Sequence, residues 1–267
     1  MQRPRPQPEP IRRAAVVSHG RPGTLGDALS RLEKRAQVAG VEIVDVADEI
    51  DLILALGGDG TMLRALRATL GRPTPVFGVR YGRVGFLTSA ESDQLETALE
   101  RVFAGDFRVI ELCTLAGRLA GETHEAINDV VITSSEPGRM VELGWEIAGE
   151  KLGEQRCDGV ICCTPTGSTA YNLSNGGPVM MWGLDAMAMT FVAPHSLHAR
   201  PLVVPRGLDL RVTNRTSDRR VTVLVDGHGV GELAADAPLE VGLGEKFCQL
   251  ALLPEVTFFT RYHNVFP

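Results

Sequence analysis

Short apolar runs alternate with amphipathic patterns over residues 13–106. The apolar runs, which are typical of buried strands, are 14–17, 41–46, 51–56 and 75–79. Apolar residues recur at helical spacing over 25–37, 61–70 and 93–103. This alternation predicts an α/β fold, in which a parallel sheet is covered by helices on both faces and ligands bind at the carboxyl ends of the strands.

Beyond residue 106 the helical periodicity nearly disappears, and strand-like segments follow one another. These segments are 108–120, 125–133, 143–148, 159–163, 188–193, 208–213, 220–226 and 240–243, with one helical interruption at 168–174. Short strands separated by turn residues predict an antiparallel, all-β domain. We therefore expect an α/β domain over 13–106 and a β domain over 107–247. Residues 1–12 form a proline-rich leader that we expect to be disordered, and residues 248–267 return to the first domain.

Composition and charge argue against several classes of protein. The formal net charge of −6, the pI near 5.6 and the lack of a Lys/Arg run with interleaved aromatic residues argue against a nucleic-acid surface. No stretch approaches the ~18 consecutive apolar residues of a membrane-spanning helix, and the proline-rich start does not resemble a signal peptide. The five cysteines show no metal-binding spacing and indicate a reducing cytosol. We expect a soluble, cytoplasmic protein without a membrane partner.

A glycine-rich turn joins the strand expected at 51–56 to the helix that follows. Its sequence is Gly57-Gly58-Asp59-Gly60-Thr61. Glycines let a bulky anion approach the backbone, and the N–H groups at a helix start face that anion with the positive end of the helix dipole. We therefore predict that Gly57, Gly58 and Thr61 bind the phosphates of a nucleotide. No Walker-type lysine follows these glycines.

Asp59 is the unusual residue of this turn, because a carboxylate repels phosphate. Three interpretations follow from its position. It holds a cation, it accepts a proton from a hydroxyl that is being phosphorylated, or it only caps the helix. The same short motif occurs in several kinase families, so the turn alone does not identify the substrate.

A second candidate site spans residues 158–174. The apolar strand 159–163 ends there in a turn rich in threonine, proline, glycine and serine, and a short helix with free hydroxyl and amide groups follows. This arrangement suits a polar, hydroxyl-rich ligand. Tyr171 offers a ring against which a base or a sugar can lie.

Four segments of the chain occur in an order that is typical of one enzyme family. They are Gly57-Gly58-Asp59-Gly60-Thr61, Asn128-Asp129 within 126–131, the segment 158–174, and Pro194-His195-Ser196-Leu197 with Arg200-Pro201. The chain therefore resembles the NAD kinases. The glycine–acid motif is shared with diacylglycerol and sphingosine kinases. The combination of 164–171 with the Asn-Asp pair is specific to a much narrower group of proteins. The resemblance implies a Rossmann-like N-terminal domain, a C-terminal β-sandwich and a homo-oligomer, either a dimer or a tetramer.

The resemblance also implies a reaction, in which ATP with Mg²⁺ phosphorylates the 2′-hydroxyl of the adenosine ribose of NAD and gives NADP. Polyphosphate is the alternative donor, and Mg²⁺ is bound with ATP rather than in a dedicated protein site. Asp59 then corresponds to the catalytic residue that accepts the hydroxyl proton. Contacts with NAD are implied for Asp59, Gly60, Arg64, Asn128, Asp129, Arg139, Arg156, Asp158, Thr169, Ala170, Tyr171, Asn172, Leu173, Ser174 and His228.

Several of these assignments have simpler alternatives. Arg64, Arg139 and Arg156 could each be an exposed arginine. Asp158 could cap a turn before Gly159, and His228 could be incidental to a hairpin. His195 is tempting as a catalytic base, but it is better explained as a residue that fixes its loop by hydrogen bonds.

One loop departs from the family pattern. In the segment 78–87, Arg80 stands where asparagine is usual. We hypothesise that Arg80 adds a positive charge near the phosphates, so that Arg80→Asn raises the KM for ATP or NAD. Unchanged KM values for both substrates would contradict this idea.

Two other classes of protein share part of the pattern. A lipid kinase would use the same glycine–acid turn, but it needs an apolar or basic amphipathic surface for the membrane, and the sequence shows none. A non-catalytic NAD-binding regulator would keep 158–174 but would not need Asp59. Formation of NADP from NAD and ATP distinguishes these alternatives.

Overall fold

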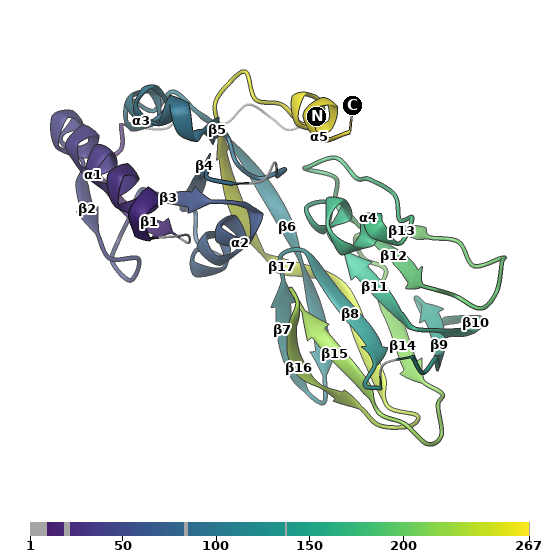
Figure 1. Cartoon of the computed structure of the whole chain (residues 1–267). Helices are drawn as coiled ribbons and strands as arrows, with labels where there is room; N and C mark the ends of the chain where they lie inside the picture. The colour runs from purple at the N-terminus through teal and green to yellow at the C-terminus, as the bar shows by residue number, and fades with distance from the viewer. Residues whose placement is uncertain (1–9, 19–21, 83–84, 137, 267) are drawn as a thin grey trace. The chain divides into compact units, whose positions relative to one another are not determined.

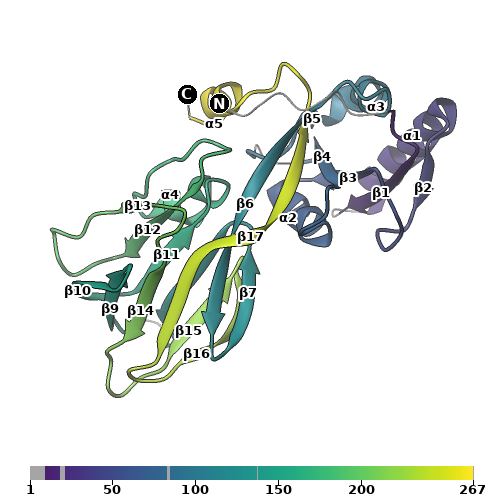
Figure 2. The same cartoon turned by 180° about the vertical axis from the view of Figure 1, so that it is seen from behind.

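The structure, a computed structural model, describes residues 10–18, 22–82, 85–136 and 138–266 (Figures 1 and 2). The chain divides into two compact units. Unit 1 comprises the residues up to Glu111 and those from Cys248 onward, and unit 2 comprises Leu112–Phe247. Most of the expected leader and His19 lie outside the described residues. Ile11, expected within the leader, is instead buried and donates its N–H to the Phe103 carbonyl oxygen.

Unit 1 contains the predicted parallel sheet. Its elements are β1 (Arg13–Ser18), α1 (Pro22–Ala39), β2 (Glu42–Val44), β3 (Leu52–Gly57), α2 (Asp59–Ala68), β4 (Pro75–Arg80), β5 (Ala90–Glu91), the 3₁₀ turn η1 (Ser92–Gln94), α3 (Leu95–Phe103), the end of β17 (Pro238–Leu252) and α5 (Phe258–Val265). The strands pair in the order β2-β1-β3-β4, all parallel. Residues 249–251 of β17 add a further parallel strand beside β4.

Alternate side chains of β3 explain why helices cover both faces of this sheet. Every residue of β3 is buried. Leu52, Leu54 and Leu56 pack in one cluster with residues of α1 and α3. Ile53 points to the opposite face, where α2 packs and Met62 is fully buried (Figure 1). A strand without a solvent-facing side has a nearly continuous apolar sequence, which is why the pattern predicted a parallel interior strand.

Unit 2 is built almost entirely from strands. Its elements are β6 (Arg108–Leu119), β7 (Glu122–Ala126), β8 (Asp129–Ser134), β9 (Val141–Ile147), β10 (Glu150–Cys157), β11 (Gly159–Cys163), the 3₁₀ turn η2 (Gly167–Thr169), α4 (Tyr171–Ser174), β12 (Ala186–Val192), β13 (Leu202–Pro205), β14 (Leu210–Asn214), β15 (Val221–Val225), β16 (His228–Leu233) and most of β17. One layer has the order β13-β12-β11-β8-β15-β16, with antiparallel neighbours throughout. The other contains β10-β9-β14-β17 with β6 and β7. The expected all-β sandwich is confirmed.

The strand β11 is buried on both of its faces. Val160 and Cys162 project into the core that the two layers share. Ile161 and Cys163 point to the outer face, where Met180 covers them. The segment after β11 therefore folds back over the sheet and lies against its outer face.

Several features differ from the prediction. The segment expected as one strand over 125–133 is two strands, β7 and β8, with a turn between them. β17 extends over 15 residues instead of 240–243, because its first part pairs with β14 and its last part with β4. β10 was not predicted, since it is exposed along most of its length and shows no apolar alternation. No helix within the described ranges is long and apolar enough to cross a membrane.

Candidate functional site

The glycine turn lies in unit 1, where β3 ends and α2 begins. A Cβ atom at Gly57 would overlap the side chain of Thr61, which is buried. The Thr61 N–H donates to the Gly58 carbonyl oxygen at 2.9 Å. Thr61 thus closes the turn, and its contact with phosphate stays a prediction. Gly58 and Gly60 border open space, because a Cβ atom built on either meets nothing within 4 Å.

Asp59 is the first residue of α2, and its carboxylate reaches across to the loop after β4. Its Oδ2 accepts the Phe86 N–H at 2.9 Å, and its Oδ1 accepts the Leu87 N–H at 3.1 Å. A Cβ atom at Gly85 would overlap the carboxylate, so the loop can pass this closely only with glycine there. The N-cap is Gly58, without a side-chain hydrogen bond, so the helix-cap interpretation of Asp59 is wrong. Since each carboxylate oxygen has two lone pairs, each can still accept a proton or a cation.

Two arginines near this turn differ in their partners. The Arg80 Nε donates to Glu91 Oε2 at 2.5 Å, and its side chain is 19% exposed. The positive charge of Arg80 is therefore already paired, which weakens the hypothesis that it meets phosphates. Arg64 is exposed on α2 and has no ion-pair partner among the residues that the structure describes. Arg64 is thus the better candidate for a phosphate or nucleotide contact.

In unit 2, the start of β8 and the ends of β11 and β15 lie side by side at one end of the six-stranded sheet (Figure 1). β8 begins beside the end of β11, where Asp129 pairs with Cys163. On its other side β8 meets the end of β15, where Val130 pairs with Val225. The Asn-Asp pair, the turn after β11 and the Asp-Gly turn after β15 are therefore neighbours. The register of the sheet brings together three segments that the sequence separates widely.

Asp226 holds the turn that precedes β8. Its carboxylate accepts the N–H groups of Ile127 at 3.0 Å, Asn128 at 2.7 Å and Asp129 at 3.2 Å. Its own N–H donates to the Asp129 carbonyl oxygen at 3.0 Å. Its φ is +47°, a left-handed conformation that aspartate adopts more readily than most residues. The sequence indicates a turn here, but it gives no sign that the Asp226 carboxylate anchors a segment 98 residues earlier.

Asn128 and Asp129 carry polar side chains at this end of the sheet. Neither side chain makes a hydrogen bond to another described residue. The Asn128 Oδ1 is buried and has no hydrogen-bond partner within the described part of the chain. Asp129 is 6% exposed, and its burial, followed by the negative charge of Asp226, raises its pKa to about 7. His228 is exposed, and its Nδ1 lies 3.0 Å from the Asp226 carbonyl oxygen. Such groups are costly in a finished core and are typical of a ligand site.

The turn after β11 is tied by its backbone to the Asn-Asp turn. The Thr164 N–H donates to the Asn128 carbonyl oxygen at 2.9 Å, and its Oγ1 donates to the Ile127 carbonyl oxygen at 2.6 Å. A Cβ atom at Gly167 would overlap the Asn128 carbonyl group. The close approach of the two turns therefore depends on Thr164 and on a glycine at 167, which lie within the predicted segment 158–174 but were assigned no individual role.

Within 169–174 the structure separates packing residues from accessible ones. The Asn172 side chain is fully buried, where its Nδ2 donates to the Ser168 and Pro178 carbonyl oxygens at 3.1 Å and its Oδ1 accepts from Thr190 at 2.7 Å. Asn172 thus packs the turn rather than facing a ligand. Tyr171 is 47% exposed. Partly or fully exposed positions are also found at Thr169, Ala170, Leu173 and Ser174.

Arg156 and Asp158 lie at the opposite end of β11. The Asp158 carbonyl oxygen accepts the Ser134 N–H at 3.1 Å, and the Arg156 carbonyl oxygen accepts the His195 N–H at 2.8 Å. The five residues of β11, at about 3.3 Å per residue, separate this group from the Asn-Asp turn. One chain therefore does not bring the two groups together. The His195 N–H is part of a loop contact, as its loop-fixing interpretation implies.

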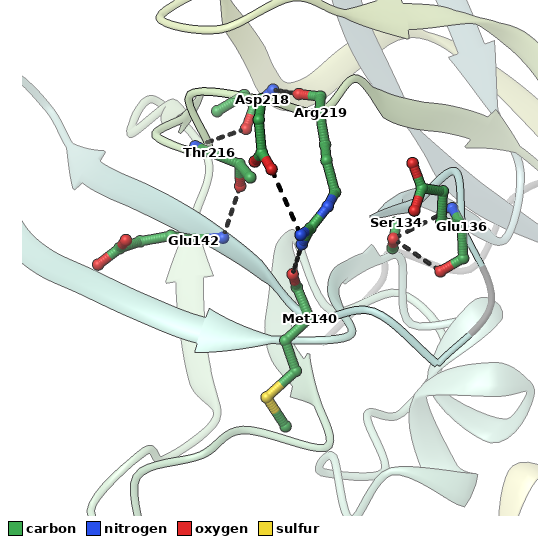
Figure 3. Close-up of polar contacts among 8 residues, drawn as sticks. Ser134, Glu136, Met140, Glu142, Thr216, Asp218 and Arg219 are labelled. Atoms are coloured by element: carbon green, nitrogen blue, oxygen red, sulfur yellow. Dashed lines mark hydrogen bonds and ion pairs between the residues drawn. The ribbon is translucent and has the colours of Figure 1, made fainter.

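Arg139 lies in the loop between β8 and β9, near the same end of the sheet. Figure 3 shows contacts at both ends of this loop. The Ser134 hydroxyl donates to the Glu136 carbonyl oxygen at 2.9 Å, and the Arg219 guanidinium donates to the Met140 carbonyl oxygen at 3.1 Å. The Arg139 side chain is exposed, so its contact with NAD stays a prediction.

Two family models match the chain. The model of the ATP-NAD kinase N-terminal domain matches residues 26–107, and that of the ATP-NAD kinase C-terminal domain matches residues 127–252. The NAD kinase of Heliobacterium modesticaldum is 38% identical over 256 residues, which cover 94% of this chain and 90% of that protein. The NAD kinase of Gemmatimonas aurantiaca is 37% identical over 238 residues, which cover 84% of this chain and 82% of that protein.

Solved structures have a similar fold. Yeast NADH kinase complexed with NADH gives a TM-score of 0.84 at 21% identity, over 96% of this chain and 88% of that one, which is a likeness of fold alone. The NAD kinase from Archaeoglobus fulgidus in complex with ATP gives a TM-score of 0.76 at 27% identity, over 95% and 97% of the two chains. These comparisons confirm the expected fold class.

Proposed function

Because the chain belongs to the ATP-NAD kinase family, we propose that it transfers the γ-phosphoryl group of ATP to the 2′-hydroxyl of the adenosine ribose of NAD, giving NADP and ADP. An oxygen–phosphorus bond forms at the ribose, the bond from the γ-phosphorus to ADP breaks, and the hydroxyl loses its proton. The observation that carries the proposal is the Asp59 carboxylate, which two backbone amides hold at the glycine turn and whose oxygens can still accept.

Asp59 acts in this proposal as the proton acceptor. A ribose hydroxyl is a poor acid, so Asp59 takes the proton late, as the phosphoryl group loosens from ADP. The Phe86 and Leu87 amides orient the carboxylate before the substrate binds, which reduces the reorganisation that the reaction requires. The open space at Gly58 and Gly60 lets phosphates approach the N-terminus of α2.

We assign part of NAD recognition to the end of the sheet where β8 begins and β11 and β15 end. The unpartnered Asn128 Oδ1 is an acceptor for an amino or hydroxyl group of adenosine. Asp129, with a pKa of about 7, can donate or accept a hydrogen bond near neutral pH. The exposed ring of Tyr171 supports stacking against a base. Contacts from Arg139, Arg156 and Asp158, which lie at the opposite end of β11, are proposed as well, and they depend on the family resemblance alone.

Magnesium is the proposed companion of ATP. When bound, Mg²⁺ would neutralise charge on the transferring phosphates. Mg²⁺ usually keeps several waters and binds substrate phosphates, and the open space at Gly58 and Gly60 leaves room for a metal–phosphate group beside the turn. The chain itself would add the α2 amides and the exposed Arg64. Polyphosphate, the alternative donor, would use the same contacts.

We also propose that the chain forms a homo-oligomer, either a dimer or a tetramer. β13 is an edge strand, and its Leu202 and Val203 are 38% and 49% exposed. Leu197, shortly before it, is 88% exposed. An edge strand with exposed apolar side chains can pair with a second chain. Light scattering tests this directly, and a mass of 28.8 kDa in solution would contradict it.

A cytoplasmic, reducing location is proposed from the cysteines. All five are free thiols. Burial raises the pKa of Cys113 to about 11 and that of Cys157 to about 12, so both are protonated and weakly reactive at neutral pH. A structure that buries four of its five cysteines as small apolar residues, with Cys113 partly buried, has no need of an oxidising compartment.

The proposed reaction is tested by incubating the purified protein with NAD, ATP and Mg²⁺ and detecting NADP with an NADP-specific dehydrogenase. We expect NADP to appear only when all three are present. NAD binding without NADP formation would indicate a regulator, and phosphorylation of diacylglycerol would indicate a lipid kinase. Replacing ATP by polyphosphate, or NAD by NADH, in the same assay defines the donor and the acceptor.

A further inference from the structure

The C-terminal helix α5 packs against the loop that holds Asp59. Phe86 is 4% exposed, and its ring lies between two rings of the C-terminal segment. The ring centroid of Phe86 is 5.8 Å from that of Phe258 and 5.7 Å from that of Phe266. Tyr262 supports this cluster from the solvent side, with its ring 5.0 Å from that of Phe266. All these residues belong to unit 1.

A short chain of contacts connects this aromatic cluster to Asp59. The backbone N–H of Phe86, the residue whose ring is held, donates to the Asp59 Oδ2, and the next N–H, that of Leu87, donates to Oδ1. Gly85, on the other side of Phe86, lies against the same carboxylate. Displacing the Phe86 ring would therefore move the amides that orient Asp59.

Two further features describe α5 itself. A capping box joins Thr257 and Thr260 at the start of the helix. Arg261, on the inner face, is 6% exposed, and its Nε has no hydrogen-bond partner within the described part of the chain. Burial lowers the pKa of Arg261, as does the nearby charge of Arg80, while the charges of Glu91 and Asp59 act in the opposite direction.

We propose that α5 is a positioning element for Asp59, in which Phe258 and Phe266 hold the Phe86 ring and thereby fix the two amides at the carboxylate. The inference rests on the proposed kinase reaction for its activity readout, but not for its structural readout. It assigns a role in catalysis to a segment that the glycine–acid motif does not include. The three phenylalanines are positioning residues, because they act through Asp59.

The first test is the kinetics of Phe258→Ala, with Phe259→Ala as the matched control. Phe259 is on the same helix, and its ring lies 6.2 Å from that of Phe258, but it is 67% exposed and is not one of the two rings that pack against Phe86. We expect Phe258→Ala to lower kcat on the order of 10-fold to 100-fold, with the KM for NAD changed by less than about twofold. Phe258→Leu, which keeps apolar volume, should recover most of kcat. Wild-type kcat in Phe258→Ala would overturn the proposal.

The second test measures hydrogen exchange of the Phe86 and Leu87 amides by NMR and needs no activity. In Phe258→Ala we expect both amides to exchange at least about tenfold faster, while the amides of β3 and β4 keep their protection. Unchanged exchange of Phe86 and Leu87 would overturn the proposal even if kcat fell. Loss of protection throughout unit 1 would mean that α5 only stabilises the fold, and would overturn it too. If the wild-type protein formed no NADP, the proposed function would fail while this measurement kept its meaning.

Discussion

The glycine turn of unit 1 and the Asn-Asp turn of unit 2 use the same device with different consequences. In each, a half-buried aspartate accepts backbone N–H groups of a turn from another part of the chain. Asp59 accepts one bond on each oxygen and faces open space at the glycines. Asp226 accepts the amides of three successive residues and lies close to a second acid, Asp129, whose pKa it helps to raise. The Asp59 carboxylate is left able to react. The Asp226 carboxylate instead holds the turn that carries Asn128 and Asp129, and those two residues are left able to bind a ligand.

Substituting Asp59 tests whether the carboxylate at the glycine turn reacts, and it has the largest expected effect on activity. Asp59→Asn keeps the shape and one acceptor, but it removes the proton acceptor, so kcat should fall on the order of 10²–10⁴-fold while NAD binding survives. Steady-state kinetics and an NAD titration measure the two effects. Asp48→Asn, at an exposed aspartate of the same unit, serves as the control. A kcat within a few-fold of wild type would exclude Asp59 as the base.

Substituting Asp226 tests whether its carboxylate holds the Asn-Asp turn of unit 2 in place. Asp226→Ala leaves three amides without their charged acceptor and should lower the free energy of unfolding by about 3 kcal/mol, with a higher KM for NAD. Urea unfolding measures the loss. Asp236→Ala is the matched control, because Asp236 also has a positive φ, of +58°, but its carboxylate makes an exposed ion pair with Arg215. If both variants lost equal stability, the effect would come from the backbone conformation and not from the hydrogen bonds.

Two asparagines of unit 2 allow a sharper separation of binding from packing. Asn172→Ala removes three satisfied hydrogen bonds from a buried side chain and should cost about 2–3 kcal/mol. Asn128→Ala removes an oxygen that has no hydrogen-bond partner among the described residues, so it should change stability by less than about 1 kcal/mol while raising the KM for NAD. Thermal unfolding and kinetics of the two variants check this. The reverse pattern would show that Asn128 is the packing residue.

The pH dependence of stability tests the acid beside Asp226. The pKa of Asp129 is raised from 3.8 to about 7 in the folded chain. Between these values the unfolded chain loses this proton and the folded chain keeps it, so the free energy of unfolding falls as pH rises from about 4 to about 7 and is level above that. The loss is at most about 1.4 kcal/mol per pH unit.

Asp129→Asn removes this titration, so its stability relative to wild type should increase across the same pH range. Urea unfolding of both proteins at several pH values measures the difference. A constant difference between pH 4 and 8 would show that Asp129 ionises in the folded chain as freely as in the unfolded chain, and that its position beside Asp226 has no electrostatic consequence.

Much of the fold could be predicted, because the two units bury their strands differently. Strand β3 is apolar throughout, and apolar residues recur at helical spacing in the helices beside it. The parallel sheet of unit 1 could therefore be predicted. In the sandwich, β11 was predicted with its observed bounds because it is buried on both faces. The edge strand β10 is exposed and was missed. The division between β7 and β8 was missed as well, because the bonds that make the turn come from Asp226, far along the chain.

By itself, the sequence determined the chemistry of the two turns: glycines and an acid after β3, and an Asn-Asp pair with a hydroxyl-rich segment. Those properties depend on neighbouring residues, which a local pattern contains. Only the tertiary structure decided which polar groups are satisfied. It pairs Arg80 with Glu91, buries Asn172, leaves the Asn128 Oδ1 without a partner within the described ranges and places the Phe86 ring against Phe258 of the C-terminal helix. The physical reason is that a hydrogen bond or a buried charge depends on residues that folding brings together from distant positions, and no local pattern records them.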